Sequence, residues 1–476
     1  MRLIAGCFFV LSLFGSQALA VSLQAQLLAE NPVSEPMFAI AAPGSPDHIF
    51  VGSRGTMDVV ILDRTTGQTV STFMNLPNAT PVAQDGLLSM AFHPDYDTNG
   101  LFYTYTFSNT DPFVRVTERR RSVANPLIAD PTYERQIFEM PNERRSHNGG
   151  WVGFSPLDGY LYATTGDGGV NNGAANGLPA QDPFDLHGKL LRVDVNGDSY
   201  PADPTRNYVI PPTNPYADGV AADPRVFSLG LRHSFRAGFD SQTGDLYIGD
   251  VGSVYFEEVN FIPGGSTGGQ NFGWRALEGS ADNPSVSDPA PPGAIDPIHE
   301  YARGSGASIV GGTVYRGSAI PELVGEYFFG DYVRDGISTL RYENGVVTSV
   351  TDRTRQLFPT FNSLGSLVSF GEDGLGEMLI IDVQRYDIYR VVAVPSIDGD
   401  YNEDGFVDVI DYTVWRDNVG APAGTLPNDP NSSVIGPDQY ATWVAEYGSV
   451  AASAAVPEPS ALFLVVIGGA LLATRR

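Results

Sequence analysis

The sequence predicts an all-β protein, a six-bladed β-propeller followed by a small α-helical calcium-binding module. One pattern recurs about six times: an apolar strand, a Pro/Asp/Gly turn, and an aromatic-rich strand that often ends in Gly-Asp or Gly-Ser. Helical periodicity is almost absent between residues 30 and 390, which argues against α/β folds. The 53 glycines and 35 prolines suit a chain with many turns.

The repeated pattern predicts where each blade lies. Its six copies span residues 38–53, 87–105, 151–167, 235–250, 311–331 and 367–382. In a propeller, equivalent hairpin ends point to one face around a central channel, so residues from distant copies are expected to meet there. The longest insertions, residues 171–185 and 280–296, are expected to shape a binding face.

The N-terminus has the pattern of a secretory signal peptide, predicted over residues 1–20. Arg2 supplies the positive start, residues 3–14 the apolar core, and Ala18-Leu19-Ala20 the small-residue cleavage site. The single cysteine, Cys7, lies inside this segment. The mature chain is therefore expected to have no disulfide, and its stability must come from a large core, metals or both.

The C-terminal residues 451–476 predict a second targeting signal. Residues 461–473 are apolar or glycine and end before two arginines, which is shorter than the roughly 20 residues of a stable membrane-spanning helix. Together with the preceding sequence VPEP at residues 456–459, this order resembles the PEP-CTERM sorting signal of Gram-negative bacteria. The resemblance implies export, transient membrane anchoring by an exosortase, and then release or surface attachment. The alternative is an ordinary tail anchor.

The charge balance restricts the partners of the protein. The formal net charge is −27, from 55 acidic and 28 basic residues. Such a surface repels nucleic acid and anionic lipid, and it favours solubility and cation binding. The 476 residues leave room for a propeller over residues 21–393 and an appended module over residues 394–450.

His147 and Asp167 bracket one short β-hairpin. Apolar runs at residues 151–154 and 160–165 flank a Pro-Leu-Asp-Gly turn, so His147 precedes the first strand and Asp167 follows the second. Because the ends of a hairpin meet, the imidazole and the carboxylate are expected on one rim of the sheet. A carboxylate fixes the tautomer of a nearby imidazole and makes it a usable general base. The alternative is a plain turn with a surface histidine.

Eight motifs, found in family order, resemble those of the glucose/sorbosone dehydrogenase family over about residues 30–392. They are QDGLLSMAFHPDY from Gln84, HNGG from His147, GYLYATTGDGG from Gly159, GKLLRVD from Gly188, GLRH from Gly230, GDVG from Gly249, EEVN from Glu257 and NFGW from Asn271. The resemblance implies a soluble six-bladed quinoprotein that oxidises aldose sugars with pyrroloquinoline quinone (PQQ) and calcium. The family also contains members similar to hedgehog-interacting proteins, whose propellers need not be enzymes.

The resemblance implies roles for individual residues. His147 looks like the general base that takes the sugar hydroxyl proton while hydride passes to the quinone, and Asp167 resembles the acid that orients it. Gln84 and Arg232 match residues that line the quinone pocket. A hard cation beside the quinone would polarise it, and a neutral imidazole would accept the proton.

The resemblance also implies two calcium sites in the propeller. Gly252 and Ser253 fall where two backbone carbonyls hold the calcium of the cofactor, although the best-known enzyme of the family has proline at the second position. Glu258 and the carbonyl of Phe272 match a second, structural calcium site.

Three positions depart from the pattern of the enzymes. His233 follows Arg232 where the enzymes have Arg-Asn, and Arg334 replaces a lysine that contacts the quinone. An Arg-Tyr-Arg triplet that binds the cofactor carboxylates is missing, because residues 362–370 read NSLGSLVSF.

The missing arginines matter because PQQ carries three carboxylates, which are costly to bury without cations. Three interpretations stay open: other basic residues compensate, cofactor affinity is lower, or the site is empty. The candidates for compensation are Arg144, Arg145 and Lys189.

Residues 400–411, DYNEDGFVDVID, have the spacing of a calcium loop. Oxygen ligands fall at loop positions 1, 3, 5, 9 and 12, a backbone carbonyl at position 7, and Gly405 makes the turn. The expected ligands are Asp400, Asn402, Asp404, Phe406 (carbonyl), Asp408 and Asp411. The last ligand is Asp rather than the Glu of an EF-hand.

A helix is expected after this loop, over residues 412–418, and the whole resembles a dockerin repeat. A degraded second copy is expected at residues 429–447, where Tyr440 and Trp443 echo Tyr412 and Trp415. The alternatives are an acidic linker, a calcium-folded spacer, or a module that docks a cohesin-like partner.

Taken together, the sequence predicts an exported oxidoreductase that uses PQQ and calcium to oxidise the anomeric hydroxyl of an aldose or oligosaccharide. Its location would be periplasmic, cell-surface or extracellular. The alternative is a non-catalytic propeller that binds carbohydrate or protein at the cell surface. The basic residues around the central channel discriminate between the two hypotheses, because only the PQQ-dependent enzyme needs cations there for the carboxylates of the cofactor.

Overall fold

A computed structural model of the chain describes residues 22–450 except 77–85, 109, 170–178 and 359–363. These residues fall into two compact units, Leu23–Ala393 and a second that starts at Val394, and each is described by itself. Within the described residues, no helix is long and apolar enough to span a bilayer. The predicted signal peptide and C-terminal sorting signal lie outside the described residues.

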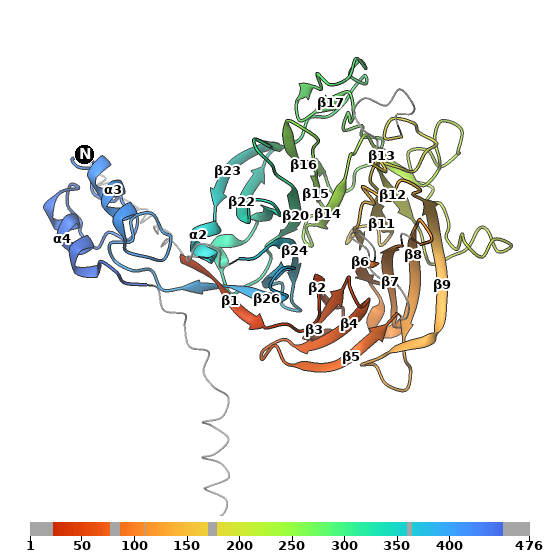
Figure 1. Ribbon diagram of the computed structural model, residues 1–476, viewed down its shortest axis with the longest axis horizontal. Helices are drawn as coiled ribbons and strands as arrows, with labels where there is room; N and C mark the ends of the chain where they lie inside the picture. Colours follow the sequence, from red (N-terminus) through yellow and green to blue (C-terminus); the bar gives the residue numbers. More distant parts are fainter. Residues whose placement is uncertain (1–21, 77–85, 109, 170–178, 359–363, 451–476) are drawn as a thin grey trace, which may run out of the picture. The chain divides into compact units, whose positions relative to one another are not determined.

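The first unit is a ring of six antiparallel four-stranded sheets (Figure 1). The first blade contains β2 (Pro36–Ala42), β3 (Ser45–Ser53), β4 (Asp58–Asp63) and β5 (Thr69–Asn75). The second contains β6 (Gly86–Phe92), β7 (Leu101–Phe107), β8 (Phe113–Arg121) and β9 (Ala129–Pro141). The third contains β10 (Val152–Phe154), β11 (Leu161–Thr164), β12 (Lys189–Val193) and β13 (Val226–Leu229).

The remaining three blades have the same order of strands. The fourth contains β14 (Ser234–Phe239), β15 (Leu246–Asp250), β16 (Phe256–Ile262) and β19 (His299–Ala302). The fifth contains β20 (Ile309–Val314), β21 (Tyr327–Asp331), β22 (Gly336–Glu343) and β23 (Val346–Asp352). The sixth contains β24 (Leu367–Glu372), β25 (Met378–Asp382), β26 (Asp387–Val394) and β1 (Ser22–Ala29). The outer strand of the last blade therefore comes from the start of the chain.

The all-β, six-bladed architecture predicted from the repeats is confirmed. Each of the six predicted copies forms the two innermost strands of one blade, from β2–β3 in the first to β24–β25 in the sixth. Short elements decorate the ring: α1 (Tyr96–Asn99), η1 (Pro321–Leu323), α2 (Thr354–Leu357), and the hairpin of β17 (Leu277–Glu278) and β18 (Ala281–Asp282). The β17–β18 hairpin lies between the fourth blade's strands β16 and β19 in the sequence.

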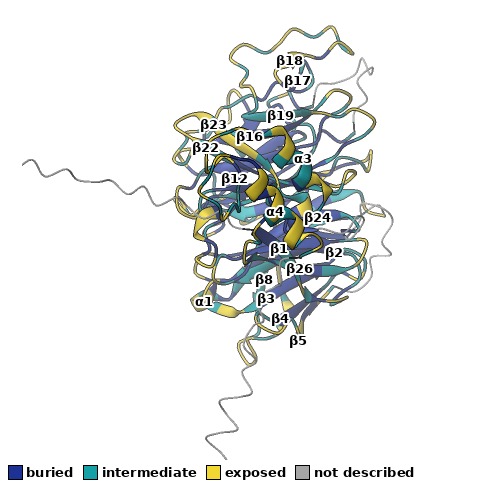
Figure 2. Ribbon diagram, turned by 90° about the vertical axis from the view of Figure 1, so that its left-hand side faces the viewer, coloured by how far each residue is buried: buried dark blue, intermediate teal, exposed yellow. Residues whose placement is uncertain are grey.

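The innermost strands contact one another around the centre and are buried on both faces. β6 is buried along its whole length, and the buried cores of the strands contrast with exposed loops in Figure 2. Burial on both faces explains why these strands are continuous apolar runs. Gly311 of β20 is needed because a side chain there would come within 2.5 Å of the Arg236 carbonyl oxygen on β14. The small residue lets neighbouring blades approach closely.

The second unit contains two helices, α3 (Val409–Asp417) and α4 (Pro437–Glu446). The side chain of Asp408 caps α3 by accepting a hydrogen bond from the Ile410 N–H at 2.6 Å. The helix therefore begins three residues before the predicted 412–418, because its N-cap is a residue of the loop itself. Both helices expose part of their surface (Figure 2).

Candidate functional site

His147 and Asp167 form a hydrogen-bonded pair at one rim of the third blade. His147 Nδ1 lies 2.6 Å from Asp167 Oδ1, and the Asp167 side chain is almost completely buried. His147 lies in the loop before β10 with a φ of 45°, and Asp167 follows β11. A side chain at Gly166 would come within 1.9 Å of the His147 carbonyl oxygen, so glycine allows the two loops to cross. The spatial pairing predicted from the hairpin is therefore present.

The carboxylate of Asp167 can bind a side chain because Asp167 lies beyond the strand end at which other blades have an aspartate that binds backbone N–H groups. In three other blades, the second strand ends in an aspartate whose carboxylate accepts backbone N–H groups of the loop that enters the first strand. These aspartates are Asp250, Asp331 and Asp382. In the third blade, Thr164 Oγ1 accepts the N–H of Trp151 at 3.3 Å, and the acid comes three residues later.

Two further donors fix the carboxylate of Asp167. Trp274 Nε1 donates to Asp167 Oδ2 at 2.8 Å, and the Gly169 N–H donates to Oδ1 at 2.8 Å. Burial alone would raise the pKa of Asp167, but the hydrogen bond and charge of His147 and the charge of Arg232 outweigh it and lower the pKa below its usual value. Asp167 therefore remains an anion that orients the His147 ring. Trp274 closes the NFGW motif, but the sequence alone predicted no role for it.

Arg232 lies across the open side of this pair. Its Nη2 is 3.5 Å from His147 Nε2, and its Nη1 donates to the Val251 carbonyl at 2.8 Å. The guanidinium carbon lies 5.3 Å from the centre of the Trp274 ring. Its Nε is buried without a hydrogen-bond partner among the described residues. An unpaired buried donor at this point favours a polar ligand.

His233 stacks on His147, with ring centroids 5.0 Å apart and ring planes 12° apart. The backbone N–H of His233 donates to Asp250 Oδ1 at 2.6 Å, and this hydrogen bond anchors the backbone at the start of β14. Burial, and then the neighbouring charges of His147 and Arg232, keep the pKa of His233 well below 6.5. His233 is thus neutral, and its buried Nδ1 has no hydrogen-bond partner in the described part of the chain.

A cavity of about 230 Å³ opens beside His233 at the centre of the ring. The residues that line it come from the strands or loops of all six blades and are mostly apolar: Met37, Arg54, Leu88, Asn148, Gly149, His233, Phe235, Val251, Ser308, Ile309, Val310, Tyr332, Val368 and Val383. Arg54 is the cation in this lining, and it is paired with Glu35 at 2.9 Å. The cavity therefore offers mostly apolar walls and little positive charge.

Arg236 lines a second cavity of about 310 Å³, which also lies among the innermost strands of the blades. The Arg236 side chain is buried and reaches from β14 to the carbonyls of Gly150 at 3.1 Å and Met37 at 2.8 Å. Its Nε donates to Ser369 Oγ at 3.1 Å. These contacts join four blades at the axis of the ring.

The loop after β15, which contains the predicted calcium-binding carbonyls of Gly252 and Ser253, is held by two charged side chains. Glu278 Oε1 accepts the backbone N–H groups of residues 253–255, each at 2.7 Å, and of Phe256 at 3.2 Å. Arg303 Nη1 donates to the Gly252 carbonyl at 2.9 Å. Glu278 and Arg303 were not identified from the sequence, because both lie far along the chain from this loop.

The other predicted cofactor and metal residues have contacts of their own. Arg334 donates to the carbonyls of Ala302, Arg303 and Gly306, so its guanidinium holds a loop. Glu258 accepts the Gly279 N–H at 2.6 Å; burial and the charge of Asp250 raise its pKa.

Phe272 packs into a hydrophobic cluster of the third and fourth blades. Gln84 lies outside the described residues, as do residues 359–363 of the segment without arginine. Within the described residues, no three His, Cys, Asp or Glu side chains are grouped so that they could hold a metal ion.

The three basic residues considered as replacements for the missing arginines lie in other surroundings. Lys189 is buried, and its Nζ donates to the carbonyls of Pro179, Ala180 and His187, while burial lowers its pKa to about 7. Arg144 lines a separate polar cavity of about 250 Å³ together with Asp167. Arg145 has a left-handed backbone, with a φ of 58°.

The predicted calcium loop of the second unit gathers its carboxylates around backbone N–H groups. Asp411 accepts the N–H groups of Tyr401 at 2.8 Å and Asp408 at 2.7 Å, and Asp400 accepts that of Gly405 at 2.9 Å. Burial and the neighbouring acids raise the pKa of Asp400 to about 7. In the second copy, Gln439 stands where Asp411 stands in the first.

In the second copy of the predicted calcium loop, the side chain at the last ligand position is an amide rather than a carboxylate. Gln439 Oε1 accepts the Gly436 N–H at 2.8 Å, and its Nε2 donates to Asp429 at 3.0 Å. The rings of Trp415 and Tyr440 lie 4.9 Å apart and join the two helices.

Curated relatives of the chain have two kinds of names. The chain is 30% identical over 385 residues to HIPL1 protein of Arabidopsis thaliana (64% of this chain, 53% of that protein) and 31% identical over 314 residues to human Hedgehog-interacting protein (63% and 41%). It is 28% identical over 262 residues to quinoprotein glucose dehydrogenase B of Acinetobacter calcoaceticus (50% of each). The chain spans about half the length of the curated relatives it matches.

Solved structures share the fold. The PQQ-bound aldose sugar dehydrogenase of Streptomyces coelicolor has a TM-score of 0.58 and 21% identity, over 79% of this chain and 98% of that one. A model of the family described as glucose / sorbosone dehydrogenase matches residues 35–362, which include the His147–Asp167 pair, Arg232 and the loop after β15. That match covers more than half of the sequence, and with it the chain belongs to the glucose/sorbosone dehydrogenase family.

Proposed function

We propose that the propeller oxidises the anomeric hydroxyl of an aldose or oligosaccharide to the lactone, with PQQ as the hydride acceptor. The observation that carries this proposal is the 2.6 Å pair of His147 Nδ1 and Asp167 Oδ1 at the edge of the channel. Membership in a family of sugar dehydrogenases supports an oxidoreductase.

The pair is arranged for proton abstraction. When the Nδ1–H of His147 donates to the anionic Asp167, the lone pair of the neutral imidazole is on Nε2. Nε2 is the atom that lies 3.5 Å from Arg232 Nη2, on the open side of the site. There it takes the proton of the substrate hydroxyl, and the imidazolium that forms is stabilised by Asp167. A bound quinone would supply the two-electron acceptor for the hydride that leaves the same carbon.

The chemistry of the pocket fits the reacting part of a quinone. Arg232 Nε and His233 Nδ1 are buried polar atoms without partners among the described residues, and both flank His147. A quinone carbonyl oxygen would accept from Arg232, and the apolar walls of the 230 Å³ cavity suit a planar ring. These residues hold and orient the ligand, and the neutral state of His233 leaves the proton-accepting role to His147.

A second candidate function is carbohydrate or protein binding without catalysis. Two observations favour it. Arg54, the cation in the cavity lining, is already paired with Glu35, so the carboxylates of PQQ meet little positive charge. Human Hedgehog-interacting protein, named for its binding of another protein, is as similar to the chain as the plant relatives are.

Reconstitution discriminates between the two functions. The purified chain, loaded with PQQ in the presence of calcium, should reduce an electron-accepting dye when supplied with members of an aldose panel. His147→Gln should lower turnover at least 100-fold, because removal of a general base costs roughly 10²–10⁴-fold. The matched control is His48→Gln, which changes a histidine on β3 whose Nδ1 contacts Ser45. No turnover by the unaltered protein with any aldose would leave the binding function.

We also propose that the protein is exported and sorted by the two terminal signals, with an exosortase as the partner of residues 451–476. A cohesin-like partner is proposed for the second unit. The sequence patterns support these proposals. Comparing the mass of the protein from its host with that of the full chain tests the first proposal, because removal of both signals would shorten the chain at both ends.

A further inference from the structure

A positively charged side chain already occupies the Gly252 loop. Arg303 lies just after β19, its backbone N–H donates to the Tyr255 carbonyl at 2.8 Å, and its Nη1 donates to the Gly252 carbonyl at 2.9 Å. The same guanidinium forms an ion pair with Glu257. Arg303 is therefore tied by its backbone and by its side chain to the two ends of the loop.

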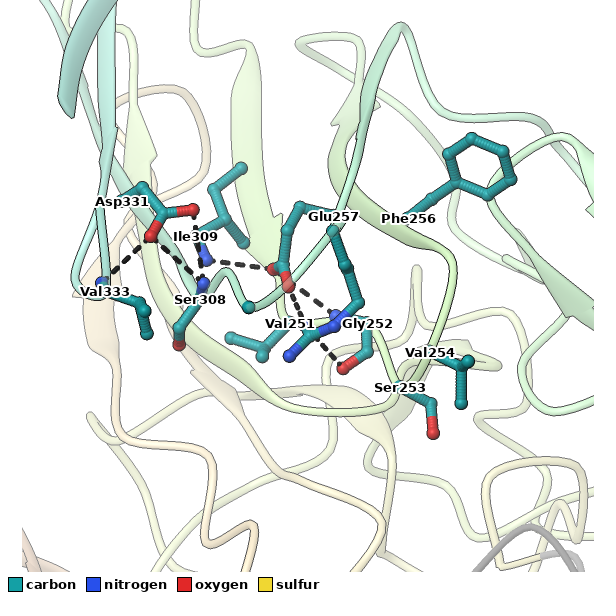
Figure 3. Close-up of polar contacts among 12 residues, drawn as sticks. Val251, Gly252, Ser253, Val254, Phe256, Glu257, Ser308, Ile309, Asp331 and Val333 are labelled. Atoms are coloured by element: carbon teal, nitrogen blue, oxygen red, sulfur yellow. Dashed lines mark hydrogen bonds and ion pairs between the residues drawn. The ribbon is translucent and has the colours of Figure 1, made fainter. Parts of the chain in front are cut away.

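The buried carboxylate of Glu257 requires a positive charge close to the Gly252 loop. This carboxylate is fully buried, and its Oε2 accepts the N–H groups of Ile309 at 2.9 Å and Gly252 at 3.4 Å (Figure 3). Two backbone donors neutralise only part of a buried negative charge, and a buried carboxylate without a counter-ion is strongly unfavourable. Because Val251 and Ile309 line the central cavity, this buried charge lies directly behind the cavity wall.

The opposite side of the loop has the complementary charge. Four N–H groups, those of residues 253–256, point at Glu278 Oε1, and Glu278 is also buried. The loop thus presents its N–H groups to an anion and its Gly252 carbonyl to a cation. Both charged groups are side chains of this chain, held on β17 and after β19. The N–H groups of residues 253–256 and the Gly252 carbonyl thus each have a charged side chain as partner, whereas Glu278 Oε2 has no hydrogen-bond partner among the described residues.

This arrangement does not fit a calcium ion on the Gly252 carbonyl. Calcium requires six to eight oxygen ligands at 2.3–2.6 Å. A guanidinium donating to the same oxygen excludes the ion by contact and by like charge. We infer that Arg303 is the fixed cation of this loop in place of calcium, so that the ligand pocket of this propeller loads without a divalent ion. The part that concerns PQQ rests on the proposed function, whereas the exchange of cation does not.

Calcium titration tests the exchange of cation without any cofactor. Asp400→Asn first removes the calcium loop of the second unit from the count. In that background, Arg303→Ala leaves Glu257 and the Gly252 carbonyl without a cation, and isothermal titration of the chelator-treated full chain should show one additional calcium. Arg303→Lys keeps a positive charge and should add none. If the Arg303→Ala variant binds no more calcium than its parent, or if the Arg303→Lys variant also gains a calcium ion, Arg303 is not a substitute for the ion.

Binding of PQQ, measured by equilibrium dialysis, tests the consequence for the pocket. Protein with Arg303 should bind PQQ equally in EDTA and in calcium, and Arg303→Ala should bind at least ten-fold more tightly with calcium than in EDTA. Loss of PQQ binding by the Arg303 protein on chelation would overturn the inference. Absence of PQQ binding under both conditions would instead refute the proposed cofactor, and the calcium titration would still decide the role of Arg303.

Discussion

The imidazole rings of His147 and His233 stack 5.0 Å apart with their planes 12° from parallel. Two adjacent imidazoles cannot both carry a proton at low cost, and burial decides which one stays neutral. Because His233 is buried beside the charges of His147 and Arg232, its pKa lies well below 6.5 and its ring stays neutral. The stack therefore places a neutral ring against the ring that is hydrogen-bonded to Asp167.

Replacing His233 should change how stability depends on pH. Burial and the charges of His147, Arg232 and Arg236 hold its pKa well below 6.5 in the folded state, and Asp250 accepts only its backbone N–H. Below about pH 6.5 the unfolded chain binds a proton at this position and the folded chain does not. This histidine therefore makes the protein less stable as pH falls, by up to about 1.4 kcal/mol per pH unit.

His233→Asn removes this titration and keeps a small polar side chain. We expect the melting temperature of the variant to fall less between pH 7.5 and pH 5.5 than that of the unaltered protein, as measured by differential scanning calorimetry. His48→Asn, at a histidine outside this site, should retain the original pH dependence. Equal falls in the His233 variant and the unaltered protein would show that His233 titrates normally in the fold.

Trp274→Phe should weaken catalysis while leaving the base in place. The substitution removes the 2.8 Å hydrogen bond to Asp167 Oδ2 and keeps an aromatic ring beneath Arg232. A hydrogen bond to a charged group contributes about 1.5–3 kcal/mol. We expect kcat to fall about ten-fold or more, and the acidic limb of the kcat profile to move to higher pH, because Asp167 loses a group that stabilises its anion. A lower kcat with an unmoved limb would indicate a packing effect only.

Arg236→Met should destabilise the ring. It leaves the carbonyls of Gly150 and Met37 and the hydroxyl of Ser369 without the donor that joins their blades. Each buried group left unsatisfied costs about 1–3 kcal/mol, so a loss of several kcal/mol in the free energy of unfolding is expected from urea titration. The Arg236→Lys variant keeps the charge but reaches fewer partners, so its stability should lie between that of the unaltered protein and that of the Arg236→Met variant. A methionine variant as stable as the unaltered chain would contradict the role of Arg236 at the axis.

Calcium should stabilise the second unit through residues 400–411. The pKa of Asp400 is raised to about 7 and that of Asp411 to about 6 by burial among other acids. A bound cation relieves this repulsion, so calcium at 100 times its dissociation constant should add about 2.7 kcal/mol. Calorimetry with EDTA and with calcium measures the shift, and Asp400→Asn should abolish it. The shift should shrink as pH falls below 7, because protons then compete with calcium for Asp400.

The repeating part of the structure could be predicted from the sequence because it depends on local patterns. Six similar strand–turn–strand copies define six blades, and the ends of one hairpin bring His147 and Asp167 together. The same patterns predicted no role for Asp250, whose carboxylate accepts backbone N–H groups of the loop that enters β14. That contact depends on how the loop folds back onto the end of β15, which local patterns do not indicate.

The remaining site residues could not be predicted because they arrive from distant parts of the chain. Trp274, Glu278 and Arg303 reach the site from loops of the fourth blade, and nothing in their local sequence indicates which atoms they contact. Arg334 was expected at the cofactor because it matches a lysine that contacts the quinone in the enzymes of the family. Its guanidinium instead donates to three loop carbonyls, since spacing along a chain fixes where a side chain begins but not where it points.

The pairing of β1 with β26 has a consequence for how the molecule is made. Among the described strands of the propeller, β1 is the first to be synthesised and its partner β26 is the last. Until then the growing chain contains both an unpaired strand and, at its other end, an unprotected sheet edge. Either one can pair with the same element of another molecule, which is a route to domain swapping and aggregation. Pairing of β1 with β26 closes the ring and removes both risks in a single step. Solubility therefore depends on β26 pairing with β1 of the same molecule before it pairs with β1 of another.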